Sequence, residues 1–180
     1  MPLSKTEFVS MLAQGRTDFS HVDFETGMDL KALNLSGLDF RDASLEGADL
    51  RGSNLSGCYL RDAILTQANL TWASLEKADI RGADFEDANA SNSSLKEAYM
   101  CGAHMNKTKL LGADLDGAYC AGTHFIQADI REARNLMTTK NLENAIFVEV
   151  LADDDQKEII RQRQILKRPE FAKDVPQVDP

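Results

Sequence analysis

The sequence predicts an all-β solenoid, a stack of coils built from a five-residue repeat and closed by a short α-helix at each end. From Leu30 to Ile130 every fifth residue is apolar, at 21 positions in all. Two residues before these repeat centres, Ala fills 14 of the 22 positions between 28 and 133. Glycine recurs two residues after a centre, where a turn can require the positive φ that other residues resist. A small residue, a large apolar residue and a turn therefore alternate along most of the chain.

A period of five residues fits neither a helix nor a flat strand. In an extended backbone, residues i and i−2 share one face. Each repeat centre and the small residue two positions before it therefore point inward, and the residue between them points outward. The two remaining residues must turn the chain. Each pentad is predicted to be one extended step followed by one corner.

Several pentads share the order Ala, then Asp or Asn, then a large apolar residue, then two variable positions. The clearest are ADLRG at 48–52, ANLTW at 68–72, ADIRG at 78–82, ADFED at 83–87 and ADLDG at 113–117. On these motifs the chain resembles the pentapeptide repeat family over residues 17–133. The resemblance implies a right-handed quadrilateral β-helix with four pentads in each coil, so that residues four pentads apart stack. Outward residues of one kind do recur at multiples of 20, namely Tyr59, Tyr99 and Tyr119, then Arg41, Arg61 and Arg81, then His104 and His124.

Residues 1–16 are predicted to form an N-terminal capping helix. Ser4 and Glu7 have the spacing of a capping box, and Phe8, Met11 and Leu12 follow on one helical face. Such a helix would cover the first coil, because an exposed coil end offers unpaired backbone groups to other chains.

The pentad phase slips once near the start of the repeat region. Phe24 lies six residues before Leu30, instead of five. One residue is therefore inserted near Thr26 and Gly27, where we expect a bulge or kink.

The C-terminal part is predicted to contain three segments. Residues 134–150 break the pentad phase and resemble the Leu- and Ala-bearing segment with which family members close the coil. Residues 151–168 carry acids at their start and bases at their end, before Pro169, which indicates a helix whose charges match its dipole. Residues 169–180 are expected to be a flexible tail.

Composition and charge exclude several classes of function. Lys and Arg number 20 against 29 Asp and Glu, a formal charge of −9, which disfavours direct binding to nucleic-acid phosphates. The chain has no apolar run of about 18 residues and no export signal, so we expect a cytoplasmic protein without membrane association. The three cysteines, Cys58, Cys101 and Cys120, lack CxxC spacing, which is typical of free thiols.

No cofactor and no metal site are expected. Asp84, His104 and His124 fall in one predicted column, and zinc uses such ligands. They lie on a convex wall, however, without a complete tetrahedral set. An enzyme is not expected either, because the sequence has no nucleophile–base pair, Gly-rich phosphate loop or concave pair of acids.

One side of the predicted coil carries all three tyrosines of the chain, and we name it the Tyr–Arg face. Its predicted partner-binding residues are Tyr59, Tyr99, Tyr119, Arg41, Arg61 and Arg81. Tyr and Arg are enriched as anchors of protein interfaces. The alternative is structural: the tyrosines stack to stabilise the coil, while Arg41 and Arg61 pair with Asp42, Asp62 and neighbouring acids.

The favoured function is a non-catalytic scaffold or regulatory binding protein that presents a rigid wall to an unknown protein partner. It would act as a monomer or as a homodimer through its C-terminal region. The alternative comes from the resemblance, because the quinolone-resistance branch of the family looks like acidic duplex DNA and binds DNA gyrase. Here Arg41, Arg61 and Arg81 interrupt the acidic rows, so this alternative is placed second.

Overall fold

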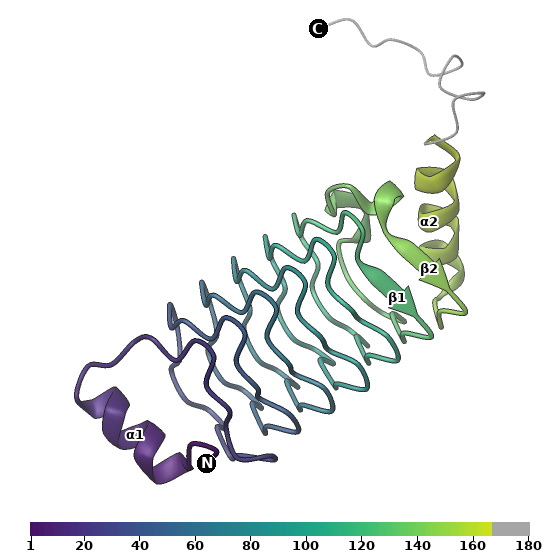
Figure 1. Ribbon diagram of the computed structural model, residues 1–180. Helices are drawn as coiled ribbons and strands as arrows, with labels where there is room; N and C mark the ends of the chain where they lie inside the picture. Colours follow the sequence, from purple (N-terminus) through teal and green to yellow (C-terminus); the bar gives the residue numbers. More distant parts are fainter. Residues whose placement is uncertain (167–180) are drawn as a thin grey trace, which may run out of the picture.

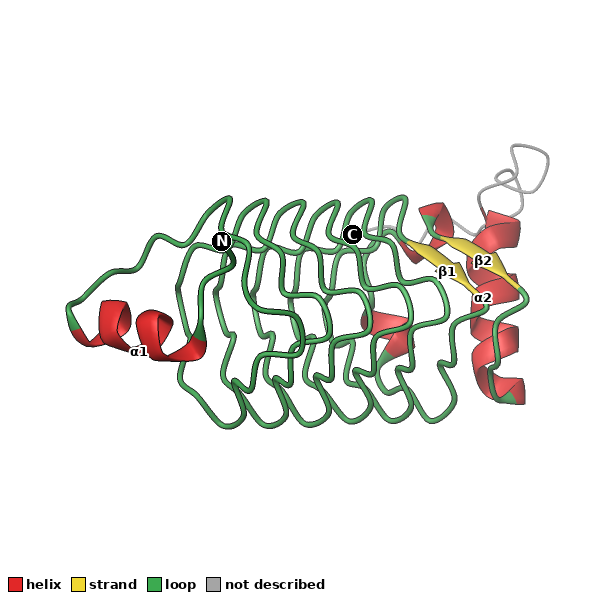
Figure 2. Ribbon diagram, turned by 60° about the horizontal axis from the view of Figure 1, so that its bottom comes forward, coloured by secondary structure: helices red, strands yellow, loops and turns green. Residues whose placement is uncertain are grey.

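The computed structural model describes residues 1–166. Its body is a rod of stacked coils between helix α1 (Lys5–Ala13) and helix α2 (Asp154–Leu166) (Figure 1). Parallel bridges join residues 20 apart, from Asp29 with Asp49 to Asp114 with Arg134. Each pentad contributes one bridge and one turn, so four pentads complete a four-sided coil (Figure 2).

The β structure of the repeat consists mainly of single bridges between coils, one for each extended step. Among the described residues the only strands are β1 (His124–Ile126) and β2 (Ile146–Val148), which pair in parallel. The reason is geometric. Two residues of each pentad turn, so only the outward residue before each centre lies where it can bridge the coils on both sides.

Each pentad bonds its backbone to both neighbouring coils. The N–H of Leu50, a repeat centre, donates to the next coil (2.8 Å), and the N–H of Asp49 donates to the preceding one (2.9 Å). At the corner, the N–H of Gly52 donates to the next coil (3.0 Å), and the N–H of Ser53 closes the turn on the carbonyl of Leu50 (3.1 Å). One backbone N–H per pentad is left over, that of the residue directly after the centre.

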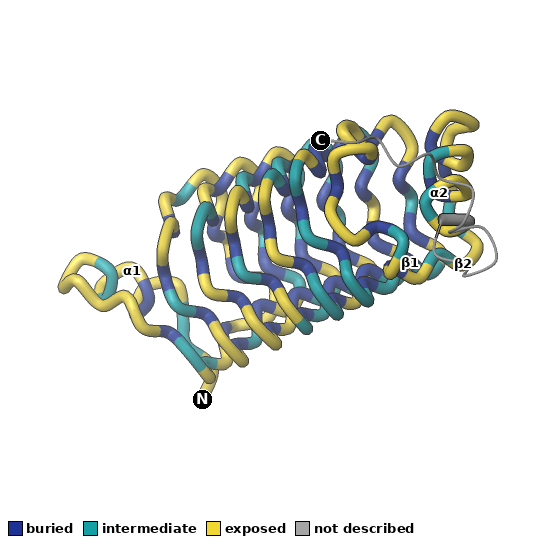
Figure 3. The backbone as a smooth tube through the Cα atoms, turned by 90° about the horizontal axis from the view of Figure 1, so that it is seen from above, coloured by how far each residue is buried: buried dark blue, intermediate teal, exposed yellow. Residues whose placement is uncertain are grey.

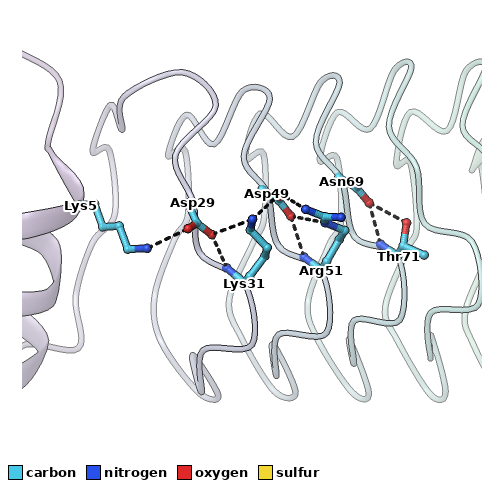
Figure 4. Close-up of polar contacts among 7 residues, drawn as sticks. All are labelled: Lys5, Asp29, Lys31, Asp49, Arg51, Asn69 and Thr71. Carbon is cyan, nitrogen blue, oxygen red and sulfur yellow. Dashed lines mark hydrogen bonds and ion pairs between the residues drawn. The ribbon is translucent and has the colours of Figure 1, made fainter.

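The side chain before the centre satisfies this remaining N–H. Asp49 Oδ1 accepts from the N–H of Arg51 (3.4 Å), and Asn69 Oδ1 accepts from the N–H of Thr71 (3.2 Å) (Figure 4). Ten further residues make the same contact: Asp18, Asp29, Asn34, Asp39, Asn54, Asp79, Asp84, Asn89, Asp114 and Asp129. Short acceptor side chains bond their own backbone two residues on, which explains why Asp and Asn prevail here.

The inside of the coil is an apolar core. All 21 repeat centres from Leu30 to Ile130 are 3% exposed or less, and buried and exposed residues alternate along each coil (Figure 3). Where Ser53 or Thr108 replaces the usual Ala, its hydroxyl donates to a backbone carbonyl, at 2.7 and 2.8 Å. Because packing occupies the inward positions, candidate sites lie on the outer walls and at the two ends.

The first coil contains one additional residue. Asp18 bridges Asp39, 21 residues on, whereas the bridges that begin at residues 29 to 114 span 20. The extra residue falls in the turn at Gly27, whose φ is +76°. The structure therefore has its insertion where the six-residue spacing predicted one, near Thr26 and Gly27.

Helix α1 covers the first coil. Ser4 caps it in a capping box: Ser4 Oγ accepts from the N–H of Glu7 (3.4 Å), and the Glu7 carboxylate accepts from the N–H of Ser4 (3.0 Å). Phe8 is fully buried, and its ring lies edge-on to Phe19 and Phe24, with centroids 4.7 and 5.2 Å away. The helix thus closes the apolar core with an aromatic cluster.

The last coil is closed by 3₁₀ helices η1 (Leu136–Thr138) and η2 (Leu142–Asn144), followed by β2. Leu136 and Leu142 are buried against the core. Extra residues lengthen this coil, because β1 pairs with β2 at an offset of 22 residues.

Helix α2 packs against η1 and η2, with Ile160 buried and Arg163 Nη2 donating to the carbonyl of Met137 (2.8 Å). The C-terminal helix expected over 151–168 is found at Asp154–Leu166, and the tail expected over 169–180 lies outside the described residues. Within residues 1–166, neither helix has the length and apolar character needed to cross a bilayer.

Candidate functional site

The bridges between coils hold the Tyr–Arg face as a single column. Asp39 bridges Tyr59, Tyr59 bridges Asp79, and Tyr99 and Tyr119 follow on the next two coils. Tyr59 and Tyr99 are 52% and 44% exposed. The structure therefore brings the three predicted tyrosines to one wall and presents two of them strongly to solvent.

These tyrosines occupy positions where Asp or Asn would satisfy a backbone N–H. A phenol ring has no oxygen close enough to its own backbone to accept from the N–H two residues on. At Tyr59, Tyr99 and Tyr119 the coil therefore gives up a local turn contact and exposes an aromatic ring. The need of the fold for Asp or Asn does not explain these residues.

Two of the tyrosines form a stack. The rings of Tyr99 and Tyr119 are nearly parallel, with centroids 5.0 Å apart and an interplanar angle of 11°. Lys140 lies against Tyr119: its Nζ is 4.2 Å from the ring centroid and donates to the phenol oxygen (2.8 Å). The structural alternative is thus correct in part, because this pair also ties the coil to its C-terminal closure.

The arginines of the face pair with the acids of the same column. Arg41 bonds the carboxylate of Asp39 with both Nε and Nη2, and Arg81 does the same to Asp79, at 2.6 to 2.7 Å. Arg61 approaches Asp79 from the preceding coil (3.6 Å). Hydrogen bonds from Arg81 lower the pKa of Asp79. The column acids are therefore held as charged partners of the arginines.

Of the acids expected to pair with Arg41 and Arg61, the neighbouring acids Asp39 and Asp79 do so, whereas the expectation is wrong for Asp42 and Asp62. Asp42 and Asp62 sit at the corner of the pentad with φ of +57°, one residue beyond each arginine. Arg41 instead folds back over Asp39, the residue before its repeat centre, and Arg61 reaches Asp79 on the next coil. Asp42 lies near Nδ1 of His21, at 3.6 Å.

An open cavity of about 390 Å³ lies on the Tyr–Arg face. Its lining includes Tyr59, Asp79 and Tyr99 from three successive coils, with Lys77 and Arg81 from the middle coil. Asp79 is at the centre, with a side chain only 15% exposed. The cavity is therefore the place where the column of large side chains is interrupted by a short one.

The other candidate column contains Asp84, His104 and His124, joined by bridges on the adjacent side. The two imidazole rings meet edge to face, with centroids 5.0 Å apart. Among residues 1–166, no group of three His, Cys, Asp or Glu side chains is placed to hold a metal ion. This column is two contacting histidines beside a carboxylate.

The cysteines are separate free thiols. Cys58 and Cys120 are repeat-interior residues, and desolvation by burial raises the pKa of Cys58 to about 11 and that of Cys120 to about 12. Cys101 is half-buried on the outer surface. Cys58 is among the residues that line the cavity of the Tyr–Arg face, and its raised pKa disfavours the thiolate there.

Comparison with protein families gives a match over most of the repeat region. A family model described as pentapeptide repeats matches in 8 copies, over residues 16–57, 29–67, 53–89, 68–106 and 83–119. The chain belongs to the pentapeptide repeat family. No curated protein matched this pentapeptide repeat protein.

Several solved structures are similar to this pentapeptide repeat protein. QnrB1, a plasmid-mediated fluoroquinolone resistance protein, is 18% identical over 82% of this chain and 87% of its own, with a TM-score of 0.35. A pentapeptide repeat protein from the Arabidopsis thaliana thylakoid lumen is 33% identical over 62% of this chain and 70% of its own, with a TM-score of 0.31. Rfr23, from the cyanobacterium Cyanothece 51142, is 19% identical over 83% and 96%, with a TM-score of 0.29.

Sequence analysis of this pentapeptide repeat protein missed two lysines that the structure adds to the face. Lys77 lines the cavity from the corner before Asp79, and Lys140 covers Tyr119. Lys77 could have been found from the sequence, because it occupies the corner of its pentad, two residues before Asp79. Lys140 bridges Tyr119 at an offset of 21 residues, so the regular period placed it one position away from the column.

Proposed function

We propose that this pentapeptide repeat protein is a non-catalytic scaffold or regulatory binding protein, built on the right-handed quadrilateral β-helix that its family resemblance implies. The Tyr–Arg face is its contact surface for one protein partner, without direct binding to nucleic acid or membrane. The free thiols of the described residues favour a reducing compartment, and we place the protein in the cytoplasm.

The observation that carries the proposal is the use of tyrosine at three positions of one column. Asp or Asn there would satisfy a backbone N–H, as Asp39 and Asp79 do on the same side. Tyr59 and Tyr99 instead expose about half of their surface. Exposed tyrosines beside arginines have the composition of interface anchors, which favours a binding role over a purely structural one.

The distribution of acids favours the scaffold over the DNA mimic that inhibits gyrase. A DNA mimic needs rows of unpaired negative charge. On another side of the coil, Asp29 contacts Lys5 and Lys31, and Asp49 contacts Lys31 and Arg51 (Figure 4). These acids also accept from backbone N–H groups, so they serve the coil and their charge is largely compensated.

The proposal is tested by site-specific photocrosslinking. We would place p-benzoylphenylalanine at position 59, on the Tyr–Arg face, and at position 64, on the adjacent side where Ile64 is similarly exposed. A partner that crosslinks from 59 and not from 64 is the expected result. Its crosslinking should be lost with Tyr99→Ala plus Tyr119→Ala, while the Tm of the double variant falls only slightly. Equal crosslinking from both positions would contradict the Tyr–Arg face as the contact surface.

A gyrase supercoiling assay, run with the purified protein at two salt concentrations, separates the two functions. The scaffold proposal expects no inhibition. Potent inhibition that weakens as salt rises would instead favour DNA mimicry, because salt screens exposed charges.

A further inference from the structure

The column of the Tyr–Arg face has a gap at Asp79. We propose that this gap is a binding slot for an aromatic side chain, flanked by acidic residues, on the protein partner. The inference rests on the proposed function and names the chemical group that the face would recognise.

The first argument is the spacing of the aromatic column. Tyr59 and Tyr99 both bridge Asp79, one from each neighbouring coil. Adjacent coils lie about 4.8 Å apart at strand spacing, so Tyr59 and Tyr99 are separated by about 10 Å at the backbone. A planar ring at the level of Asp79 would lie about 5 Å from each neighbour. The stack of Tyr99 on Tyr119 has this separation, 5.0 Å between centroids.

The second argument is the space above Asp79. The cavity of about 390 Å³ is lined by Tyr59 and Tyr99 at its two ends and by Asp79 at its base. This volume falls in the range of roughly 300–1,000 Å³ typical of small-ligand pockets. Because Tyr119 covers one side of Tyr99, the uncovered side of that ring faces the coil of Asp79. An inserted ring would continue the existing stack.

The third argument is charge, which selects among planar groups. The carboxylate of Asp79 already accepts two hydrogen bonds from Arg81 (2.6 and 2.7 Å) and lies 3.6 Å from Arg61. Lys77 adds a third cation to the rim, 4.0 Å from Glu97. The three cations Arg61, Arg81 and Lys77 outnumber the two acids Asp79 and Glu97, so a guanidinium or ammonium ligand would meet a net positive rim. A neutral ring with acidic neighbours fits both the stack and the rim.

The test uses a peptide probe and NMR. The probe is acetyl-Gly-Glu-Phe-Glu-Gly-amide, compared with a peptide that has Lys in place of Glu and with one that has Leu in place of Phe. We expect saturable binding of the probe, with upfield shifts of its Phe ring protons and transferred contacts to the rings of Tyr59 and Tyr99. Binding of the lysine and leucine peptides should be at least 10-fold weaker.

Three variants locate the binding. Asp79→Tyr places a tyrosine ring in the gap, at the position before a repeat centre that Tyr59 and Tyr99 also occupy. This variant should abolish probe binding. Tyr59→Ala removes one end of the slot and should weaken binding at least 10-fold. Ile64→Ala changes a similarly exposed residue on the adjacent side, leaves both slot rings in place and is the matched control, with a change below 3-fold.

Each outcome decides the inference. Absence of saturable ring shifts, or equal binding to Asp79→Tyr, would overturn the slot, while crosslinking of a partner from position 59 would still support the Tyr–Arg face. Equal binding of the lysine peptide would overturn the acidic specificity. Probe binding in the slot without any partner crosslinked from position 59 would overturn the proposed function instead.

Discussion

The rings of Tyr99 and Tyr119 stack across two successive coils, 5.0 Å apart and 11° from parallel. Lys140, from the segment that closes the last coil, lies over the ring of Tyr119, with its Nζ 4.2 Å from the ring centroid. Both sides of the Tyr119 ring and one side of the Tyr99 ring are therefore used within the molecule. The stack fixes the orientation of Tyr99, so that its other side is presented at the coil of Asp79.

This stack is expected to couple the two tyrosines energetically. Aromatic pairs contribute about 0.5–1.5 kcal/mol beyond the area that they bury, and partial exposure favours the lower end. Tyr99→Ala and Tyr119→Ala should therefore cost less together than the sum of the single changes, by about 0.5–1 kcal/mol. Thermal or urea unfolding of the four proteins measures this coupling.

The control is the pair Tyr59→Ala and Tyr119→Ala, whose residues lie three coils apart on the same column. Their effects on the free energy of unfolding should add. A coupling of equal size in this control pair would assign the effect to the coil as a whole and contradict a specific stack.

Acid should weaken the coil through Asp49. Hydrogen bonds from Arg51 lower the pKa of Asp49 from 3.8 to about 2. A carboxyl whose pKa is lowered by folding stabilises the protein above its unfolded pKa and loses this contribution as pH falls through the folded pKa. Asp49→Asn should be less stable than the parent by about 1 kcal/mol at pH 7, a value reduced because Arg51 is half exposed to solvent.

The difference in Tm between parent and Asp49→Asn should shrink as pH falls from 4 to 2. Asn is the appropriate replacement because Asn69, one coil on, keeps the contact to the backbone N–H. Arg51→Ala should remove the same pH dependence. A Tm difference that stays constant down to pH 2 would show that the charge of Asp49 is not its source.

The period of five predicts the core of this molecule from the sequence, because burial repeats with the backbone geometry. Leu50 and the other centres are buried because each pentad makes one extended step, with its centre pointing inward, and then one corner. The insertion near Gly27 was also predictable, since a slip of one residue breaks the period visibly. Periodicity works here because each pentad contacts its counterparts one coil away.

Contacts that depend on side-chain direction were not predictable in the same way. The sequence indicated acids near Arg41 but not which of them it pairs with: the corner turns Asp42 away and leaves Asp39 within reach. The cavity beside Asp79 depends on side chains from three coils, and no local motif encodes it. Lys140 reaches Tyr119 only because the closing coil contains an additional residue.

Gly82 leaves room for the side chain of Asp62, which lies at the same corner one coil earlier. The φ of Gly82 is +67°, and the position of a Cβ at Gly82 overlaps Oδ1 of Asp62. Gly82→Ala should therefore lower the free energy of unfolding by about 2 kcal/mol, of which about 1 comes from the left-handed backbone. Equilibrium unfolding in urea measures the loss.

Gly52→Ala separates the two causes, because Gly52 has a similar φ of +63° and open space around a Cβ. It should cost only the backbone contribution, about 1 kcal/mol. Adding Asp62→Ala to Gly82→Ala should bring its cost down to that of Gly52→Ala. If Gly82→Ala costs as much in the Asp62→Ala background as in the parent, the overlap with Asp62 is not the cause.

The three thiols should differ in reactivity. Thiolates are the reactive species, and burial raises the pKa of Cys58 to about 11 and of Cys120 to about 12. Iodoacetamide near pH 8 should modify native protein once, at half-buried Cys101. Peptide mapping by mass spectrometry identifies the site, and Cys101→Ser should leave the native protein unmodified. Modification of Cys120 before unfolding would contradict the closed interior.

Phe8 should be the residue on which the N-terminal closure depends. Its ring is fully buried, 4.7 Å from Phe19 and 5.2 Å from Phe24. Phe8→Ala would leave a cavity among these rings and cost about 3–5 kcal/mol if the whole chain unfolds as one unit.

Each coil of a solenoid contacts mainly its neighbours, so the destabilisation by Phe8→Ala should instead concentrate at the N-terminal end. Hydrogen exchange should then accelerate at the amides of Phe19 and Phe24, while that of Leu110, several coils away, stays protected. Uniform acceleration along the rod would show that the coils unfold together.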